Sequence, residues 1–250
     1  EGEALKKIQS EFIIQIFDIV EIAGKTILVL QVAGEESLAK HLRKYGVPTL
    51  DLLSRYGSNL LSAVESLERH GVVHRDIKPD NIGIFKNNRS ENQLILYDFS
   101  LTSAALDNIR IGTTGYTDPF LKNRKSGKWD LAAERYSAGV ALYEMTVGHD
   151  QLPKWGEGDV PNPADTKDEL VLDAEKFKPS VREGLIDFFK KAMHRDPEKR
   201  FDIAKEMRFD WEKVFMEADN QVITTPSGEQ VTTTIPLDEA VLDTLIAALD

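Results

Sequence analysis

The spacing of hydrophobic residues changes character along the chain. Residues 12–22 and 25–32 are rich in β-branched and aromatic residues, and Ala23-Gly24 between them is a typical hairpin turn. Residues 3–9 show a helical pattern instead, with apolar positions on one face. The beginning of the chain is therefore predicted to form a short helix followed by a β-hairpin.

Helical spacing dominates after Gly34. A long pattern of apolar residues at three- and four-residue steps opens at Pro48 and stops at His70-Gly71. Two short strands are predicted at 82–86 and 94–98. Further helices are predicted at 37–45, 131–147, 167–176, 179–193 and 202–217. This order, a few strands followed mostly by helices, predicts an α+β protein with a small sheet and a larger helical lobe.

The last segment of the sequence has a different pattern. Residues 222–235 alternate β-branched residues around Pro-Ser-Gly and predict a hairpin, and residues 237–250 predict an amphipathic helix. Neither segment carries recognisable chemistry. We interpret both as packing or linking elements.

Composition and charge narrow the class of protein. The chain has 250 residues, of which 41% are hydrophobic and 29% charged, and it carries a formal net charge of −11. The negative charge argues against binding of bulk nucleic acid or of an anionic membrane. No apolar run reaches the length of a membrane span, and the chain has no cysteine, which suits a reducing compartment. We expect a cytoplasmic protein with neither nucleic acid nor a membrane as partner.

Two polar motifs lie close together in the middle of the sequence. Residues 74–81 read HRDIKPDN, and residues 97–100 read YDFS. Together they resemble the catalytic loop and the metal-binding segment of eukaryotic-type protein kinases. A second His-Arg-Asp tripeptide at 194–196 lacks lysine and asparagine at the required offsets, so the tripeptide by itself means little. The combination of both motifs makes the resemblance specific.

The resemblance implies a role for each polar residue. Phosphoryl transfer depends mainly on positioning and charge neutralisation. Asp76 is expected to lie beside the attacking hydroxyl, and Lys78 is expected to reach the transferring phosphate. Asn81 and Asp98 would ligate Mg²⁺, which prefers hard oxygen ligands. Thr113, in GTTGYTDPF, stands where serine/threonine-directed kinases place a hydroxyl that bonds the catalytic aspartate and lysine.

The same resemblance assigns a second group of residues to the nucleotide. Residues 28–33 match the last strand and the hinge of a kinase N-lobe. Leu30 would be the gatekeeper, and the hinge backbone from Gln31 to Ala33 would bond the adenine edge. Gly83 replaces an apolar side chain under the adenine, which would thin the floor of the pocket.

The sequence departs from the kinase pattern at its start. Glu1 falls where the family places the glutamate of helix C, and neither a glycine-rich loop nor the usual strand lysine precedes the hinge. We expect this start to reflect truncation of a larger polypeptide that supplies the rest of the N-lobe. A natural partial kinase is the alternative.

Two further departures affect the middle of the chain. Ser100 replaces the glycine of the family's Asp-Phe-Gly motif, which we interpret as a change in switching, since Asp98 is intact. Residues 118–120 read DPF where Ala-Pro-Glu is usual. The buried ion pair of Arg200 with that glutamate is therefore expected to be lost, and Arg200 would pair with Glu134 or Asp202 instead or remain partly exposed.

The resemblance as a whole implies a serine/threonine protein kinase domain that transfers the γ-phosphate of ATP, with Mg²⁺, to a protein substrate. Residues 1–34 would be the remnant of the N-lobe, 35–218 the C-lobe and 219–250 an extension, as in a bacterial multidomain kinase. This fragment alone is expected to be nearly inactive. A non-catalytic scaffold or allosteric module is the main alternative, and a small-molecule kinase is disfavoured by Lys78.

Overall fold

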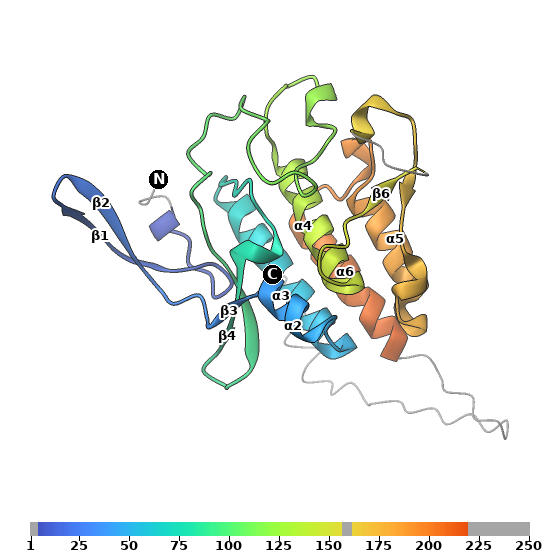
Figure 1. The fold of residues 1–250 in the computed structure, drawn as a ribbon, viewed down its shortest axis with the longest axis horizontal. Helices are drawn as coiled ribbons and strands as arrows, with labels where there is room; N and C mark the ends of the chain where they lie inside the picture. The colour runs from blue at the N-terminus through green and yellow to red at the C-terminus, as the bar shows by residue number, and fades with distance from the viewer. Residues whose placement is uncertain (1–4, 157–161, 220–250) are drawn as a thin grey trace, which may run out of the picture.

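The computed structural model describes residues 5–156 and 162–219, and all structural statements below concern these residues. Figure 1 shows a β-hairpin projecting from one side of a helical body. The α+β fold, with a small sheet and a larger helical part, is confirmed. The hairpin expected at 222–235 and the helix expected at 237–250 lie outside the described residues.

The projecting hairpin is formed by β1 (Ile16–Ile22) and β2 (Lys25–Leu30), which pair antiparallel. Ala23 and Gly24 connect the strands with φ of 52° and 73°, the left-handed backbone that a tight hairpin turn requires. The predicted hairpin is therefore confirmed. The predicted helix before it is shorter in the described part of the chain, where only Leu5 and Lys6 are helical.

A second small sheet lies against the helical body. Its order is β3 (Glu36–Ser37), β4 (Ile82–Lys86) and β5 (Asn92–Leu96), all antiparallel. β5 begins and ends two residues earlier than predicted, because Tyr97 donates its backbone N–H to the Asn81 carbonyl at 2.9 Å and leaves the ladder. The motif at residues 74–81 ends where β4 begins, and the motif at residues 97–100 begins where β5 ends, so this sheet brings the two motifs together.

Five α-helices form the larger part. Polar side chains cap the N-termini of three of them, with Ser37, Thr49 and Asp130 accepting hydrogen bonds from the backbone of the first turn. No helix in the described ranges combines the length and the apolar character needed to cross a bilayer. The helices are α2 (Leu38–Tyr45), α3 (Leu50–Arg69), α4 (Leu131–Val147), α5 (Arg182–Ala192) and α6 (Ala204–Asp219).

Helix α4 is the centre of the core. Every residue from Ala133 to Val147 is buried, so this part of the helix has no solvent-exposed face and is enclosed by its neighbours. Helix α6 packs across α3 through Trp211, whose indole N–H donates to the Ser54 carbonyl at 3.0 Å. Gly57 permits this contact, since a β-carbon there would lie 2.2 Å from the indole ring.

One predicted helix is wrong. Residues 167–176 form the two-residue strand β7 (Leu170–Val171) and the 3-10 helix η4 (Ala174–Lys176). β7 pairs with β6 (Lys154–Trp155), and the backbone N–H of Asp173 donates to the Tyr143 hydroxyl at 2.9 Å. These tertiary hydrogen bonds outweigh the local amphipathic pattern, because each buried backbone group must find a partner.

Candidate active site

Three predicted site residues meet in one hydrogen-bonded cluster. The Thr113 hydroxyl donates to Asp76 Oδ1 at 2.6 Å, and Lys78 Nζ donates to Thr113 Oγ1, also at 2.6 Å. Lys78 Nζ also lies 2.9 Å from Asp76 Oδ2. A carboxylate, a cation and a hydroxyl are therefore held together from segments that are 35 or more residues apart in sequence.

Asn81 completes this cluster with a defined amide orientation. Its Nδ2 donates to the Asp76 carbonyl at 2.8 Å and to Asp76 Oδ2 at 2.9 Å. The amide oxygen points away from these two bonds, and no hydrogen bond to it exists among the described residues. Asn81 therefore fixes the Asp76 carboxylate and keeps a hard oxygen ligand available for a cation.

The Asp76 carboxylate is held in its ionised form. Burial raises its pKa, but the hydrogen bonds from Thr113 and Lys78 outweigh burial, and the pKa is lowered from its ordinary value. A carboxylate in this state can accept a hydrogen bond from an approaching hydroxyl at neutral pH. This is the protonation state that general-base or positioning chemistry needs.

Glu134 on α4 holds the backbone at the start of the HRDIKPDN segment in place. Its carboxylate accepts hydrogen bonds from the backbone N–H groups of His74 and Arg75, each at 2.9 Å, and from the Trp129 indole at 2.5 Å. Burial raises the pKa of Glu134 to about 7, against the effect of these three donors. Arg75 has a φ of 72°, and the two N–H bonds to Glu134 hold the loop in this uncommon conformation.

His74 is a packed residue with a single favoured tautomer. Its ring lies 4.6 Å from that of Phe99, and Nε2 is 2.9 Å from the Tyr97 carbonyl, so Nε2 carries the proton and donates. Nδ1 accepts from the Asp76 backbone N–H at 3.3 Å. Complete burial lowers the pKa of His74 below its ordinary value. These contacts describe a packed and hydrogen-bonded residue.

The buried neutral His74 predicts a pH-dependent stability. Below its ordinary pKa of 6.5 the unfolded chain takes up a proton at this position that the folded chain resists. The free energy of unfolding therefore includes the full contribution of neutral His74 at pH values above about 6.5. This contribution is lost as pH falls below about 6.5, by up to ~1.4 kcal/mol per pH unit. We expect His74→Phe to flatten this slope in urea unfolding measured at several pH values.

The control for this measurement is His70→Phe, because His70 is exposed and lies just beyond α3. The His70 variant should keep the slope of the unchanged protein. Equal slopes in all three proteins would contradict the assignment of a buried neutral imidazole at position 74.

Asp98 is one of the residues that line a mainly apolar cavity of about 580 Å³. It lies two residues after the end of β5 and has a φ of 63°, an uncommon backbone for a residue other than glycine. Leu30 of β2 lines the same cavity together with Phe99, so two of the predicted site residues meet here. The bond between Tyr97 N–H and the Asn81 carbonyl joins the segment that carries Asp98 to the catalytic loop.

The predicted nucleotide-binding residues do not all line that cavity. Gln31 lines a separate polar groove with Gln15, and its backbone N–H donates to the Gln15 carbonyl at 2.9 Å. Ala33 lies against Gly83, where a β-carbon on Gly83 would be 1.9 Å from the Ala33 carbonyl oxygen. Position 83 therefore requires glycine, because the backbone at Ala33 approaches it closely. The Ala33 backbone occupies the space next to Gly83, where we expected the floor of the adenine pocket to be thinner. Glu1 lies outside the described residues.

The expectation that Arg200 loses its buried ion pair, and then turns to Glu134 or Asp202 or stays partly exposed, is wrong. Arg200 Nη1 lies 2.6 Å from Asp118 Oδ2, and both side chains have 0% exposure. Arg124 also pairs with Asp118. The carboxylate therefore comes from the first residue of Asp-Pro-Phe, where the family pattern places it on the third. Matching the motif position by position missed this ion pair. The only sign of it in the sequence is that Asp118 lies two residues before the position where the family has glutamate.

Comparison with known proteins agrees with this geometry. The family model described as the protein kinase domain matches residues 1–211. The chain belongs to the protein kinase family. The cluster around Asp76 therefore lies within a protein kinase domain, and the buried helix α4 supports the loop that carries it through Glu134.

Several curated proteins are similar to this kinase domain. The probable kinase PglW of Streptomyces coelicolor is 39% identical, over 92% of this chain and 16% of its own length. A probable serine/threonine-protein kinase of Clostridium perfringens is 24% identical, over 92% of this chain and 33% of its own length. A serine/threonine-protein kinase of Arabidopsis thaliana is 33% identical over 59% of this chain. The chain thus spans a third or less of each of these relatives.

Proposed function

We propose that this kinase domain transfers the γ-phosphoryl group of ATP to serine or threonine hydroxyls of a protein substrate. The observation that carries the proposal is the cluster in which Thr113 bridges Asp76 and Lys78, with both bonds at 2.6 Å. Such a cluster places a base and a cation at one point, which suits in-line transfer of a charged group to a hydroxyl.

Each residue has a distinct part in this proposal. Asp76 accepts a hydrogen bond from the acceptor hydroxyl and takes its proton as transfer proceeds. Lys78 lies beside the carboxylate and offsets negative charge on the transferring group. Thr113 holds the base and the cation at a fixed separation.

The donor set fits Mg²⁺ bound with ATP. The Asn81 amide oxygen and the Asp98 carboxylate are hard oxygen ligands, and the fold joins their segments through Tyr97. Bound Mg²⁺ would neutralise charge on the phosphates and orient them. Leu30, Gln31, Ala33 and Gly83 stay predicted neighbours of the adenine, and Glu1 stays the predicted partner of a lysine in the remainder of the N-lobe.

The proposal includes a larger polypeptide that supplies the rest of the N-lobe. The coverage of the relatives supports it, since this chain corresponds to 16% of PglW and 33% of the clostridial protein. A cytoplasmic location is part of the proposal, because a chain without cysteine needs no oxidising compartment.

Thermal unfolding of the intact polypeptide with Mg-ATP tests the nucleotide site. Ligand that binds the folded state raises stability by about 2.7 kcal/mol at a hundredfold excess over Kd. We expect an upward shift of Tm that needs both Mg²⁺ and ATP and that Asp98→Asn removes. Asp107→Asn, an exposed change in the following loop, should keep the shift.

A second candidate function is a non-catalytic scaffold or allosteric module. The close approach of Ala33 to Gly83 favours it, because this approach narrows the space for the adenine of ATP. Absence of any Tm shift at millimolar Mg-ATP in the intact polypeptide would support this alternative. A shift accompanied by phosphate transfer to protein would exclude it.

A further inference from the structure

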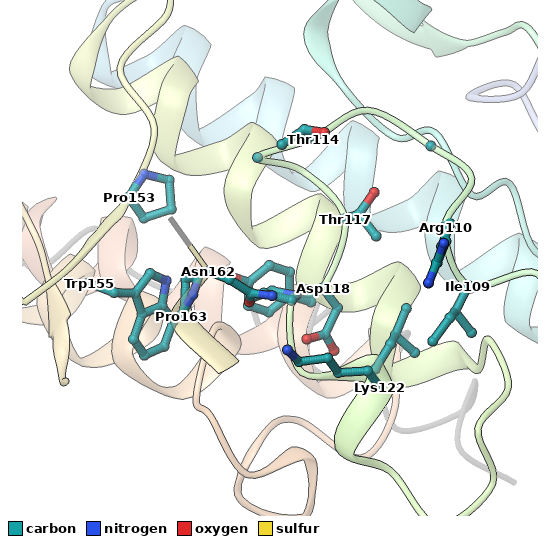
Figure 2. Close-up of a pocket in the computed structure, with 15 residues that line it drawn as sticks. Ile109, Arg110, Thr114, Thr117, Asp118, Lys122, Pro153, Trp155, Asn162 and Pro163 are labelled. Carbon is teal, nitrogen blue, oxygen red and sulfur yellow. The ribbon is translucent and has the colours of Figure 1, made fainter. Parts of the chain in front are cut away.

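A cavity of about 750 Å³ opens beside the catalytic cluster (Figure 2). Its lining includes Gly112 and Thr114, the two chain neighbours of the threonine that contacts Asp76. A chain bound in this cavity would therefore lie next to the hydroxyl that receives the phosphoryl group. Nothing in the catalytic cluster uses this space.

The walls of the cavity are held by buried polar contacts. Tyr116 donates its hydroxyl to the buried Glu144, and Asp118 is fixed by the Arg200 ion pair. Arg195 stacks on Trp155, with its guanidinium 5.1 Å from the ring centroid, and donates to the Pro163 carbonyl at 2.8 Å. These contacts fix the described walls of the cavity within the folded domain, which favours a preformed binding surface.

The two ends of the cavity differ in chemistry. Figure 2 shows Pro153 and Trp155 on one side and Arg110 on the other, with Lys122 between them. The cavity thus combines an apolar wall with two cationic side chains. Such a surface suits an extended peptide that carries an apolar and an acidic side chain.

The cationic side chains retain capacity for an anion. Arg110 is exposed and forms no ion pair within residues 5–156 and 162–219. Lys122 pairs at 2.5 Å with Asp165, whose side chain is 65% exposed, so the pair is open to competition. The lining carboxylate Asp118 is already neutralised by Arg200 and Arg124. Arg110 and Lys122 therefore give this cavity a local positive charge, although the net charge of the chain is −11.

We propose that this cavity selects protein substrates with a glutamate or aspartate close to the phosphoacceptor, through Arg110 and Lys122. The inference rests on the proposed function and adds the class of substrate, acidic peptide segments. Guanidinium and ammonium groups bind carboxylates by charge-assisted hydrogen bonds, and lysine- or arginine-rich segments would be repelled.

The test uses the intact polypeptide and a set of serine peptides that are otherwise uncharged. Glutamate, or glutamine as its isosteric match, is placed in turn at each of the three positions on either side of the serine. We expect kcat/KM for the best glutamate peptide to exceed that of its glutamine match by about three- to tenfold at low salt. The ratio should fall as ionic strength rises.

Variants of the two cations connect this preference to the cavity. The double variant Arg110→Gln/Lys122→Gln should bring the ratio close to one, and Arg110→Glu should favour a lysine peptide instead. The control Lys205→Gln/Lys213→Gln removes two exposed cations of α6 and should keep the ratio. A merely structural role of Arg110 would not reverse the preferred charge of the peptide.

Binding measured separately distinguishes this inference from the proposed function. Fluorescence anisotropy of labelled glutamate and glutamine peptides reports discrimination without phosphoryl transfer. Discrimination that the double variant abolishes supports the inference even if no peptide is phosphorylated, in which case the proposed function fails. Phosphorylation or binding without discrimination, or discrimination that survives in the double variant, overturns the inference.

Discussion

Replacement of Asp76 by alanine in the intact polypeptide is expected to reduce kcat by about 10²- to 10⁴-fold. The reason is that the carboxylate receives three hydrogen bonds, from Thr113, Lys78 and Asn81, and is therefore the group that organises the cluster. Phosphate transfer to protein from labelled ATP measures the loss. Binding of Mg-ATP should remain, because the proposed metal ligands Asn81 and Asp98 are unchanged.

The chain offers its own matched control in the second His-Arg-Asp tripeptide. Asp196 occupies the same place in that tripeptide but caps the 3-10 helix η6, where it accepts from the Glu198 backbone N–H at 3.0 Å. Asp196→Ala should cost roughly 1 kcal/mol of stability as a lost cap and leave kcat near that of the unchanged protein. An Asp76→Ala protein as active as Asp196→Ala would refute the catalytic assignment.

Asp118→Ala is expected to have the largest effect on stability. It leaves Arg200 as a buried and unpaired cation, since the ion pair at 2.6 Å joins two side chains with 0% exposure. Removal of one partner of a buried pair costs about 3–5 kcal/mol. For a domain of this size, the corresponding fall in Tm is on the order of 10 °C. Thermal unfolding followed by circular dichroism measures it.

An exposed ion pair provides the comparison for this variant. Glu217 lies 3.5 Å from Lys213 on α6, with both side chains about two-thirds exposed (65% and 66%). Glu217→Gln should change stability by less than about 1 kcal/mol. If Asp118→Ala were no more destabilising than Glu217→Gln, the pairing of Asp118 with Arg200 would be wrong.

Much of the fold could be predicted because its signals are local. The helix expected at 131–147 matches α4 residue for residue, and the turn at Ala23-Gly24 has the expected left-handed backbone. Strong periodicity, polar caps and turn residues specify such elements within a few neighbours. The failure at 167–176 has the opposite cause, because the pairing of β7 with β6 and the hydroxyl of Tyr143 come from elsewhere in the chain.

The candidate active site also combines residues that local patterns identify with contacts that only the fold creates. The residues of HRDIKPDN and YDFS, together with Thr113, could be singled out from type and spacing, and the structure joins Asp76, Lys78, Asn81 and Thr113 by hydrogen bonds. Spacing could not show that Ala33 closes on Gly83, or that Gln31 faces a different groove from Leu30. These two features depend on how the segment from Gln31 to Ala33 packs against β4, which no local pattern in the sequence specifies.

The sequence by itself determined the class of fold, most helices and the identity of the polar residues around Asp76, since each follows from short-range pattern or from a specific motif. Only the tertiary structure decided the partner of Arg200 and the contacts of Glu134 with the catalytic loop. The physical reason is that a buried charge takes whichever opposite charge or N–H donors the packing brings within reach, whatever their position in the sequence.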